Sequence, residues 1–183
     1  MTKIAILGAT GYTALELMKL LLRHPGVEIT ALTSRRENRP VDQVHPSLTG
    51  QLGLPLENLE PTEVARRAEA VFSCLPHTAT AAVVPELLAG GAKVIDFGAD
   101  YRFNDVAVYE KWYNVVHPDA ARLSSVPYGL PELFRSAIKG APLVANPGCY
   151  ATSALLPLTP LVRAGLVLAD DIIIDAKSGV SGA

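Results

Sequence analysis

The first part of this chain contains a glycine turn between a short apolar run and a helix, and this arrangement restricts the fold more than any other feature. Residues 4–7 are apolar, as expected for a buried strand, and residues 8–11 read Gly-Ala-Thr-Gly. Residues 15–23 carry one polar stripe at helical spacing, and residues 27–33 are rich in β-branched side chains. Strand, turn, helix and strand in this order form a βαβ unit, which requires parallel strands and a right-handed crossover.

The alternation of strands and helices continues along the chain. The pattern predicts helices at residues 61–69 and 78–89 and strands at residues 70–75, 93–97 and 143–145. We therefore expect an α/β fold, with a Rossmann-like, doubly wound and mostly parallel sheet over residues 1–148. Residues 149–183 are expected to begin a second, α+β domain, with a helix followed by a strand at residues 171–175.

Two stretches lack this periodicity. Residues 35–60 are punctuated by prolines and glycines, and a structureless loop of that length is uncommon inside a compact domain unless it has a function. Residues 98–140 are also irregular, with a short helix expected at residues 109–114.

The charge balance and the cysteine content narrow the classes of partner and site. Sixteen basic and eighteen acidic residues give a net charge of -2, which indicates neither a nucleic-acid nor a membrane partner. The apolar run at residues 4–7 is too short for a signal peptide or a membrane span, so we expect a cytoplasmic protein. Cys74 and Cys149 are expected to be thiols. No metal site is expected at Cys74-x-x-His77, because the remaining ligands would have to come from the scattered histidines 24, 45 and 117.

The glycine turn has the pattern Gly8-x-x-Gly11-x-x-Ala14 and opens a helix directly after a strand. In that context the glycines let the backbone approach a pyrophosphate, to which the helix N-terminus offers free N–H groups. The residues expected to bind the dinucleotide here are Gly8, Thr10, Gly11, Tyr12 and Thr13. The alternative is a glycine turn needed only for close packing of strand and helix.

The end of the second strand bears on which dinucleotide binds. NAD-binding units usually place an acidic residue there, whereas this chain has Thr33-Ser34-Arg35-Arg36. A hydroxyl and guanidinium groups suit a 2′-phosphate, so NADP(H) is the expected cofactor, bound by Ser34 and Arg35. The alternative is a solvated basic turn.

Two further segments end strands at the edge where open α/β sheets bind ligands. The first is Cys74-Leu75-Pro76-His77, in which His77 either faces the cofactor or caps the next helix. The second runs from Asp96 to Arg102, where Arg102 is a candidate anion receptor or else a surface ion-pair partner of a nearby aspartate.

Residues 143–152 predict a buried strand, a tight turn and a cysteine at the start of a helix. The turn is Asn146-Pro147-Gly148, and Cys149 follows it. Free N–H groups and the positive end of the helix dipole favour a thiolate in such a position, which is one route to a nucleophilic cysteine. A buried core cysteine is the alternative.

Seven motifs extend over the chain: Gly8-Ala9-Thr10-Gly11-Tyr12-Thr13, His45-Pro46-x-Leu48-x-Gly50, Ser73-Cys74-Leu75-Pro76-His77, Asp96-x-x-x-Asp100-Tyr101-Arg102, Tyr128-Gly129-Leu130-Pro131-Glu132, Asn146-Pro147-Gly148-Cys149-Tyr150 and Ser178-Gly179-x-Ser181-Gly182-Ala183. Together they resemble the N-acetyl-γ-glutamyl-phosphate reductase family of arginine biosynthesis. Aspartate-semialdehyde dehydrogenase is similar in plan but typically carries Asn before the cysteine, so Gly148 separates the two families.

The resemblance implies an NADPH-dependent reductive dephosphorylation that yields N-acetylglutamate semialdehyde. It implies that Cys149 attacks the acyl phosphate to give a thioester, which is then reduced. By the same resemblance Arg102 binds the phosphate and Asn146 belongs to the substrate site. Cys74, Pro76 and His77 belong to the cofactor site, to which the loop at Ser178 and Gly179 adds a cover for the nicotinamide. The partners expected are the acyl phosphate, inorganic phosphate and, in the full-length form, further copies of the chain.

The sequence given departs from this family in one respect. The family's general acid/base histidine lies beyond Ser-Gly-x-Ser-Gly-Ala, and the sequence stops at Ala183. We therefore expect little activity from these 183 residues alone. Two alternatives stay open: a related dehydrogenase acting on an aspartyl or aminoadipyl-type phosphate, and an NADP-binding sensor that needs no reactive thiol.

Overall fold

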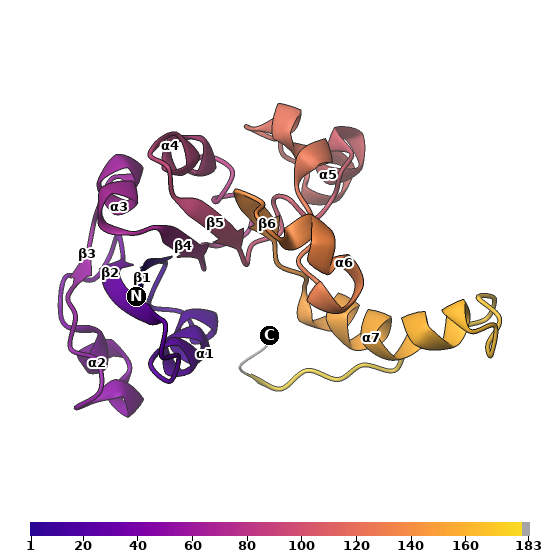
Figure 1. The fold of residues 1–183 in the computed structure, drawn as a ribbon, viewed down its shortest axis with the longest axis horizontal. Helices are drawn as coiled ribbons and strands as arrows, with labels where there is room; N and C mark the ends of the chain where they lie inside the picture. The colour runs from indigo at the N-terminus through magenta and orange to yellow at the C-terminus, as the bar shows by residue number, and fades with distance from the viewer. Residues whose placement is uncertain (181–183) are drawn as a thin grey trace.

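The computed structural model describes residues 1–180 and contains one six-stranded sheet in which every pair of neighbouring strands is parallel (Figure 1). The strand order is β3-β2-β1-β4-β5-β6. This is the order of the Rossmann fold, and it confirms the predicted fold class. The strands are β1 (Thr2–Leu7), β2 (Val27–Thr33), β3 (Leu56–Glu57), β4 (Ala70–Ser73), β5 (Lys93–Asp96) and β6 (Leu143–Ala145).

Helices cover both faces of the sheet. The α-helices are α1 (Tyr12–Leu21), α2 (Val41–Val44), α3 (Pro61–Arg67), α4 (Val84–Ala89), α5 (Val106–Tyr113), α6 (Pro131–Ile138) and α7 (Cys149–Arg163), and the 3-10 helices are η1 (Pro46–Leu48) and η2 (Ala120–Ser125). Figure 1 shows α3 and α4 on one face and α1 and α2 on the other. Val64 and Leu87 belong to the first apolar core, and Met18 and Leu48 to the second.

Strand β1 lies at the centre of the sheet. The strands that follow it are added first on one side, as β2 and β3, and then on the other side, as β4, β5 and β6. β1 pairs with β2 on one side and with β4 on the other. The helix that follows β1 and the one that follows β4 therefore pack on opposite faces. The segments that leave the carboxyl ends of β1 and β4 run to opposite faces of the sheet, and such a position is where open α/β sheets bind ligands.

Three predictions about local structure were wrong. The helix expected at residues 78–89 begins only at Val84, so Pro85 occupies its first turn, where a proline costs no hydrogen bond. Strand β3 was missed because its two residues carry too little pattern. Residues 171–175 form no strand despite three consecutive isoleucines, because no strand among residues 1–180 pairs with them.

The insertion between β5 and β6 is held together by buried polar contacts. Tyr101 donates its hydroxyl to Asp119 across 2.8 Å, and the Nε2 atom of His117 lies 2.9 Å from the carbonyl oxygen of Asp100. His117 also accepts the N–H of Asp119 at Nδ1, so its proton lies on Nε2. The irregular stretch is therefore an ordered part of the domain.

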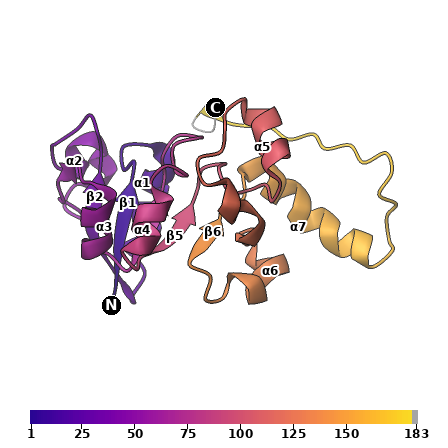
Figure 2. The ribbon, with the colours of Figure 1, turned by 90° about the horizontal axis from the view of Figure 1, so that it is seen from above.

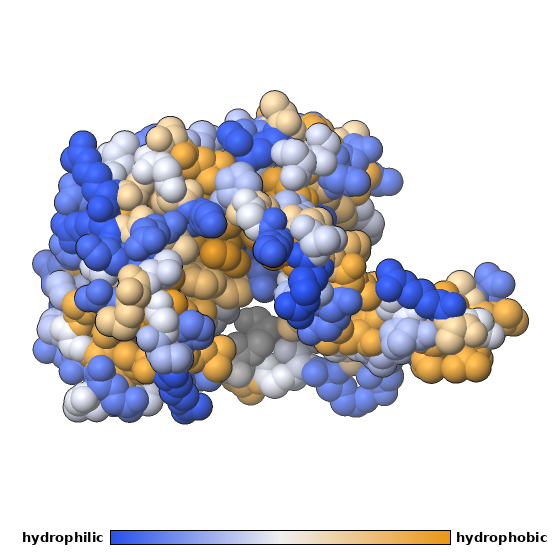
Figure 3. Space-filling view, in the orientation of Figure 1, coloured by the Kyte–Doolittle hydropathy of each residue, from blue (hydrophilic) through white to orange (hydrophobic). Residues whose placement is uncertain are grey.

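Helix α7 extends away from the sheet, and the chain after it turns at the far end of the helix and runs back toward the sheet (Figures 1 and 2). Apolar side chains along this segment are exposed, as the projecting arm in Figure 3 shows. The largest exposures are those of Leu168 at 79%, Ile173 at 93% and Val180 at 98%. Residues 181–183, which include part of one of the seven motifs, lie outside the described residues.

Candidate dinucleotide site and nucleophile

The glycine turn after β1 requires glycine at its first position for two independent reasons. Gly8 has a φ of +71°, in the left-handed region that favours glycine. A Cβ atom on Gly8 would lie 2.7 Å from the carbonyl oxygen of Cys74, which is closer than real contacts allow. Gly8 therefore lets the turn after β1 pass directly beside the end of β4.

The turn leads into the N-terminus of α1, whose N-cap residue is Gly11. The carbonyl of Gly11 accepts the N–H of Leu15, and no side chain within residues 1–180 caps this end of the helix. Free N–H groups of the first helical turn consequently face the space above the sheet, where an anion is stabilised by them and by the helix dipole. The first turn of α1 carries no acidic side chain, which keeps the site electropositive.

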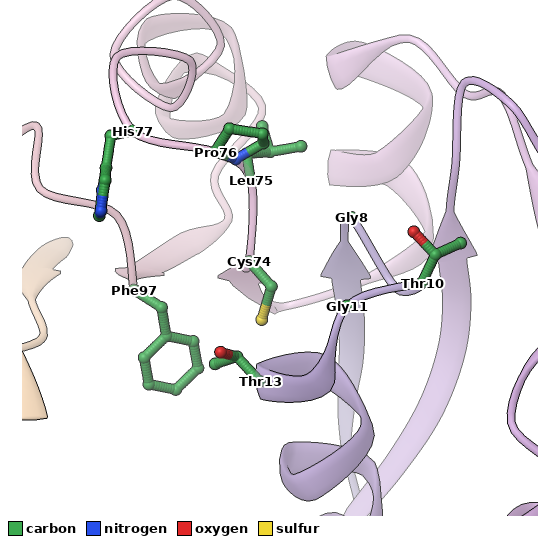
Figure 4. Close-up of a pocket in the computed structure, with 9 residues that line it drawn as sticks. All are labelled: Gly8, Thr10, Gly11, Thr13, Cys74, Leu75, Pro76, His77 and Phe97. Carbon is green, nitrogen blue, oxygen red and sulfur yellow. The ribbon is translucent and has the colours of Figure 1, made fainter. Parts of the chain in front are cut away.

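A cavity of about 440 Å³ opens at the carboxyl edge of β1 and β4 (Figure 4). In Figure 4 the Cys74 sulfur, the Phe97 ring and the Thr13 hydroxyl point toward one another, with His77 at the far end of the space. The lining residues are Gly8, Thr10, Gly11, Thr13, Cys74, Leu75, Pro76, His77 and Phe97. The structure thus brings together most of the residues predicted to bind the cofactor.

The other predicted cofactor residues do not line this cavity. Ser34 follows β2 and is buried, and its hydroxyl accepts the N–H groups of Arg36 and Glu37. Arg35 is exposed. The Ser34 hydroxyl thereby shapes a turn that presents the basic side chains to solvent.

Three more predicted residues are exposed and lie away from the cavity wall. Tyr12 is the first residue of α1, and Ser178 and Gly179 lie in the extended C-terminal segment. Among the described residues, no hydrogen bond joins Ser178 or Gly179 to the glycine turn. Their assignment stays a prediction.

His77 lines the cavity and does not cap a helix, because the N-cap of α4 is Val83. Its ring lies 6.3 Å from the ring of Tyr113. Cys74 also lines the cavity, but burial raises the pKa of its thiol to about 12, with a further contribution from the charge of Asp96. Cys74 is therefore a thiol that packs, not a nucleophile.

Arg102 connects the ends of β5 and β6. Its Nε atom donates to the carbonyl oxygen of Asn146 across 2.9 Å, and Nη2 donates to the carbonyl oxygen of Phe97 across 2.8 Å. No carboxylate among the described residues forms an ion pair with it, so the alternative of a surface pair with Asp100 or Asp105 is wrong. The Asp100 carboxylate accepts the N–H groups of residues 78 and 81.

Cys149 is the first residue of α7, as predicted, and its side chain is exposed. The N-cap residue is Gly148, whose carbonyl oxygen accepts the N–H and the hydroxyl of Thr152. The turn before it is held by the N–H of Asn146, which donates to the carbonyl oxygen of Asp96 across 2.8 Å, and by Arg102. Cys149 does not line the cavity; it lies on the neighbouring part of the same sheet edge.

Asp96 ends β5 inside the protein, between the two parts of the edge. Its side chain is fully buried, and Oδ1 accepts the N–H of Gly98 across 2.7 Å. Within residues 1–180, Oδ2 has no hydrogen-bond partner. Burial raises the pKa of Asp96 to about 6, and the contacts with Gly98 and Thr80 oppose this shift.

The comparison with protein families places most of the chain in one family. The model of the family "Semialdehyde dehydrogenase, NAD binding domain" matches residues 3–141, which is most of the chain. The chain belongs to the semialdehyde dehydrogenase family. A second model, "Semialdehyde dehydrogenase, dimerisation domain", matches residues 149–183.

Several curated relatives of this semialdehyde dehydrogenase chain share one name. The chain is 49% identical over 182 residues to N-acetyl-gamma-glutamyl-phosphate reductase of Rhodopirellula baltica. It is 52% identical over 184 residues to the protein of that name from Moorella thermoacetica. These matches cover 99% and 100% of this chain and 53% of each relative. The resemblance read from the motifs is confirmed, and the chain spans about half the length of these relatives.

Solved structures of similar fold include two aspartate semialdehyde dehydrogenases. Aspartate semialdehyde dehydrogenase from Candida albicans, solved with NADP, superposes with a TM-score of 0.66 at 21% identity, covering 90% of this chain and 47% of that one. An enzyme of the same name from Vibrio cholerae gives a TM-score of 0.64 at 18% identity, covering 90% and 47%. At these identities the comparison establishes the fold of this chain.

The sequence pattern missed two lining residues of the semialdehyde dehydrogenase site. Phe97 follows β5 directly and stacks with Phe72 of β4 at a ring distance of 6.0 Å. Leu75 lies between the predicted residues Cys74 and Pro76. The available signal was that both residues follow the ends of strands. In the sequence, however, an apolar residue at such a position cannot be distinguished from a core residue.

Neither a metal site nor a membrane span is found in the described part of the chain. No group of three or more His, Cys, Asp and Glu side chains within residues 1–180 is arranged to hold a metal ion. None of the helices described there combines the length and apolar character that crossing a membrane requires.

Proposed function

We propose that this chain carries the cofactor site and the nucleophile of an NADPH-dependent N-acetyl-γ-glutamyl-phosphate reductase. The observation that supports the proposal most directly is the placement of two features on one sheet edge. The glycine turn and the free N-terminus of α1 lie beside β1, and Cys149 begins α7 directly after β6. The names of the relatives favour the N-acetylglutamyl substrate.

The residues at the glycine turn fit a dinucleotide. Gly8 lets the turn lie directly against the end of β4, and the uncapped start of α1 offers N–H donors to a diphosphate. Thr10, Thr13 and His77 add polar groups to a wall that is otherwise apolar. A nicotinamide ring requires such a mixture of apolar contact and a few hydrogen bonds.

NADP(H) is preferred over NAD(H) in this proposal because of Ser34 and Arg35. No acidic residue stands directly at the end of β2, where it would repel a 2′-phosphate. The Ser34 hydroxyl keeps its proton free for donation, since it accepts hydrogen bonds from the backbone. Arg35 is exposed and free to pair with phosphate.

The experiment that tests the cofactor proposal is a comparison of NADPH and NADH binding to the chain. Quenching of the nucleotide fluorescence would give both dissociation constants. Tighter binding of NADPH by roughly tenfold or more is expected, since an Arg–phosphate contact contributes about 1.5–3 kcal/mol. Equal affinities would overturn the role of Ser34 and Arg35.

Cys149 would act by covalent catalysis. Its thiolate attacks the carbonyl carbon of the acyl phosphate, a C–S bond forms, and inorganic phosphate leaves with the electrons of the C–O bond. Reduction of the resulting thioester to a thiohemiacetal requires a hydride, which is the chemistry that a bound nicotinamide supplies. Collapse of the thiohemiacetal releases the aldehyde and restores the thiol.

Arg102 would bind the phosphate of the substrate. Its Nε and Nη2 atoms are already bound to carbonyl oxygens, so Nη1 is the part of the guanidinium available to an anion. That atom lies close to Gly148, next to the nucleophile. Asn146 would contribute through its backbone, which fixes the direction of Arg102.

The general acid/base and the subunit contacts are assigned to parts of the full-length protein. The family's catalytic histidine has no counterpart in position among His24, His45, His77 and His117. We therefore expect slow turnover by the 183-residue chain alone. Steady oxidation of NADPH by the 183-residue chain with the acyl phosphate would overturn that expectation. The exposed apolar side chains of α7 favour a homo-oligomer in the full-length form.

A further inference from the structure

The irregular segment between β2 and β3 packs beneath the glycine turn. Val41 and Leu48 of this segment are fully buried in the core that also contains Ala9 and Ala14. The segment is anchored at both ends, because Val41 donates to the carbonyl of Leu54 and residues 40 and 55 form a bridge. Figure 1 shows it on the same face of the sheet as α1.

One side chain of this segment reaches the turn itself. His45 is 8% exposed, and its Nε2 atom lies 3.0 Å from the carbonyl oxygen of Ala9. A carbonyl oxygen accepts but never donates, so the proton of this imidazole lies on Nε2. The contact joins positions 36 residues apart in the sequence.

This bond determines the direction of the peptide between Ala9 and Thr10. The peptide is trans, so its C=O and its N–H point in opposite directions. With the carbonyl of Ala9 held toward His45, the N–H of Thr10 points to the opposite side, where Thr10 lines the cavity. None of the described residues accepts a hydrogen bond from this N–H.

We propose that His45 is a positioning residue of the dinucleotide site, which holds the Ala9–Thr10 peptide so that the Thr10 N–H is offered to the diphosphate. Without the bond, a rotated peptide would present the Ala9 carbonyl oxygen to the same anion and repel it. The inference rests on the proposed cofactor site and assigns a function to the irregular segment that carries His45. Oriented backbone N–H groups are a common way of binding phosphate.

Two amide variants separate this role from simple packing. In His45→Gln the side-chain N–H reaches about as far as Nε2 of histidine, whereas in His45→Asn it reaches only as far as Nδ1. Both variants bury an amide, so the cost of burial is similar. The dissociation constants of NADPH and of 2′-AMP, which lacks the diphosphate, would be measured for each, together with the melting temperature of the free protein.

We expect His45→Asn to bind NADPH about tenfold more weakly and 2′-AMP within about twofold of the wild type. His45→Gln should restore NADPH binding to within about twofold. His117→Asn is the matched control, because His117 is 3% exposed and its Nε2 atom lies 2.9 Å from a carbonyl oxygen in the β5–β6 insertion. It should lower the melting temperature similarly and leave NADPH affinity unchanged.

Three results would overturn the inference while the proposed cofactor site stands. They are wild-type affinity for NADPH in His45→Asn, an equal loss of NADPH and 2′-AMP binding in that variant, and equal weakening by Asn and Gln. A wild-type chain that binds neither NADPH nor NADH would overturn the proposed cofactor site and the inference with it.

Discussion

The Nη1 atom of Arg102 lies 3.0 Å from the position that a Cβ atom would take on Gly148. The backbone of Gly148 has φ −70° and ψ 155°, an extended conformation that any residue adopts. The constraint on a larger residue here is therefore the space beside the guanidinium and not the conformation of the backbone. A side chain at this position would displace the one part of the guanidinium that no carbonyl holds.

Gly148→Ala is predicted to weaken the attraction of anions to Cys149. The reaction rates of Cys149 with iodoacetate and with uncharged iodoacetamide report this attraction separately from thiol reactivity. We expect the ratio of the two rates to fall roughly fivefold, which corresponds to about 1 kcal/mol between partly exposed charges. Arg102→Gln should lower the ratio further, because it removes the charge.

Gly53→Ala is the control for this variant, since nothing lies within 4 Å of a Cβ atom at Gly53. It should leave both rates unchanged. If Gly148→Ala slows both reagents equally, the variant has altered the reactivity of the thiol. The proposed displacement of the Arg102 guanidinium by a side chain at residue 148 is then wrong.

The two cysteines are predicted to differ sharply in alkylation. Cys149 is exposed, whereas burial raises the pKa of Cys74 to about 12. At pH 8 only about one Cys74 side chain in ten thousand is a thiolate, which is the reactive form. Mass spectrometry after brief treatment with iodoacetamide should find one label, at Cys149.

The label should be lost in Cys149→Ser and kept in Cys74→Ser. Unfolding in denaturant should expose both thiols and give two labels. Comparable labelling of Cys74 in the folded protein would contradict the burial of its thiol beside Asp96.

Gly8→Ala is predicted to destabilise the fold and abolish cofactor binding. The change combines strain at φ +71° with a 2.7 Å contact to the backbone of Cys74. The strain alone costs about 1–3 kcal/mol, and the contact adds to it because backbone cannot rotate away. Urea unfolding and NADPH titration would measure the two effects.

Gly50→Ala separates these causes, because Gly50 has a φ of +74° and no atom lies within 4 Å of the position that its Cβ would take. Its loss of stability should therefore reflect strain only. If Gly8→Ala costs no more than Gly50→Ala, the close approach of the turn to β4 is not important for stability.

Asp96 is predicted to make the protein less stable as the pH rises from about 4 to 6. Burial raises its pKa in the folded state from 3.8 to about 6, so the folded state holds the proton more tightly than the unfolded state. The associated stability is fully present below pH 3.8 and is lost as the pH rises through about 6. The expected loss is roughly 3 kcal/mol, on the order of two pKa units.

Asp96→Asn should remove this slope, because the amide stays neutral while its oxygen still accepts the N–H of Gly98. The free energy of unfolding in urea, measured at pH 4, 5, 6 and 7, compares the two proteins. An unchanged slope in Asp96→Asn would show that other groups cause the pH dependence.

Much of the sheet could be predicted because its signals are local. The apolar runs of β1, β2 and β6 and the breakers around them predicted strands at or near their observed bounds. The helix after β4 was predicted too long, because residues 78–83 carry helix-compatible side chains. In the structure the Asp100 carboxylate accepts the N–H groups of residues 78 and 81 and holds this stretch in a turn. The isoleucines at residues 172–174 favour a strand, but a strand also needs a partner.

The sequence by itself determined the βαβ start, the glycines of the turn and the cysteine that opens a helix, because neighbouring residues impose each of these. Only the tertiary structure decided which groups Arg102, His45 and Asp96 contact. Arg102 contacts a residue 44 positions away, and His45 one that is 36 positions away. Such contacts depend on which strand ends meet at one edge of the sheet, and no local pattern of side chains encodes that meeting.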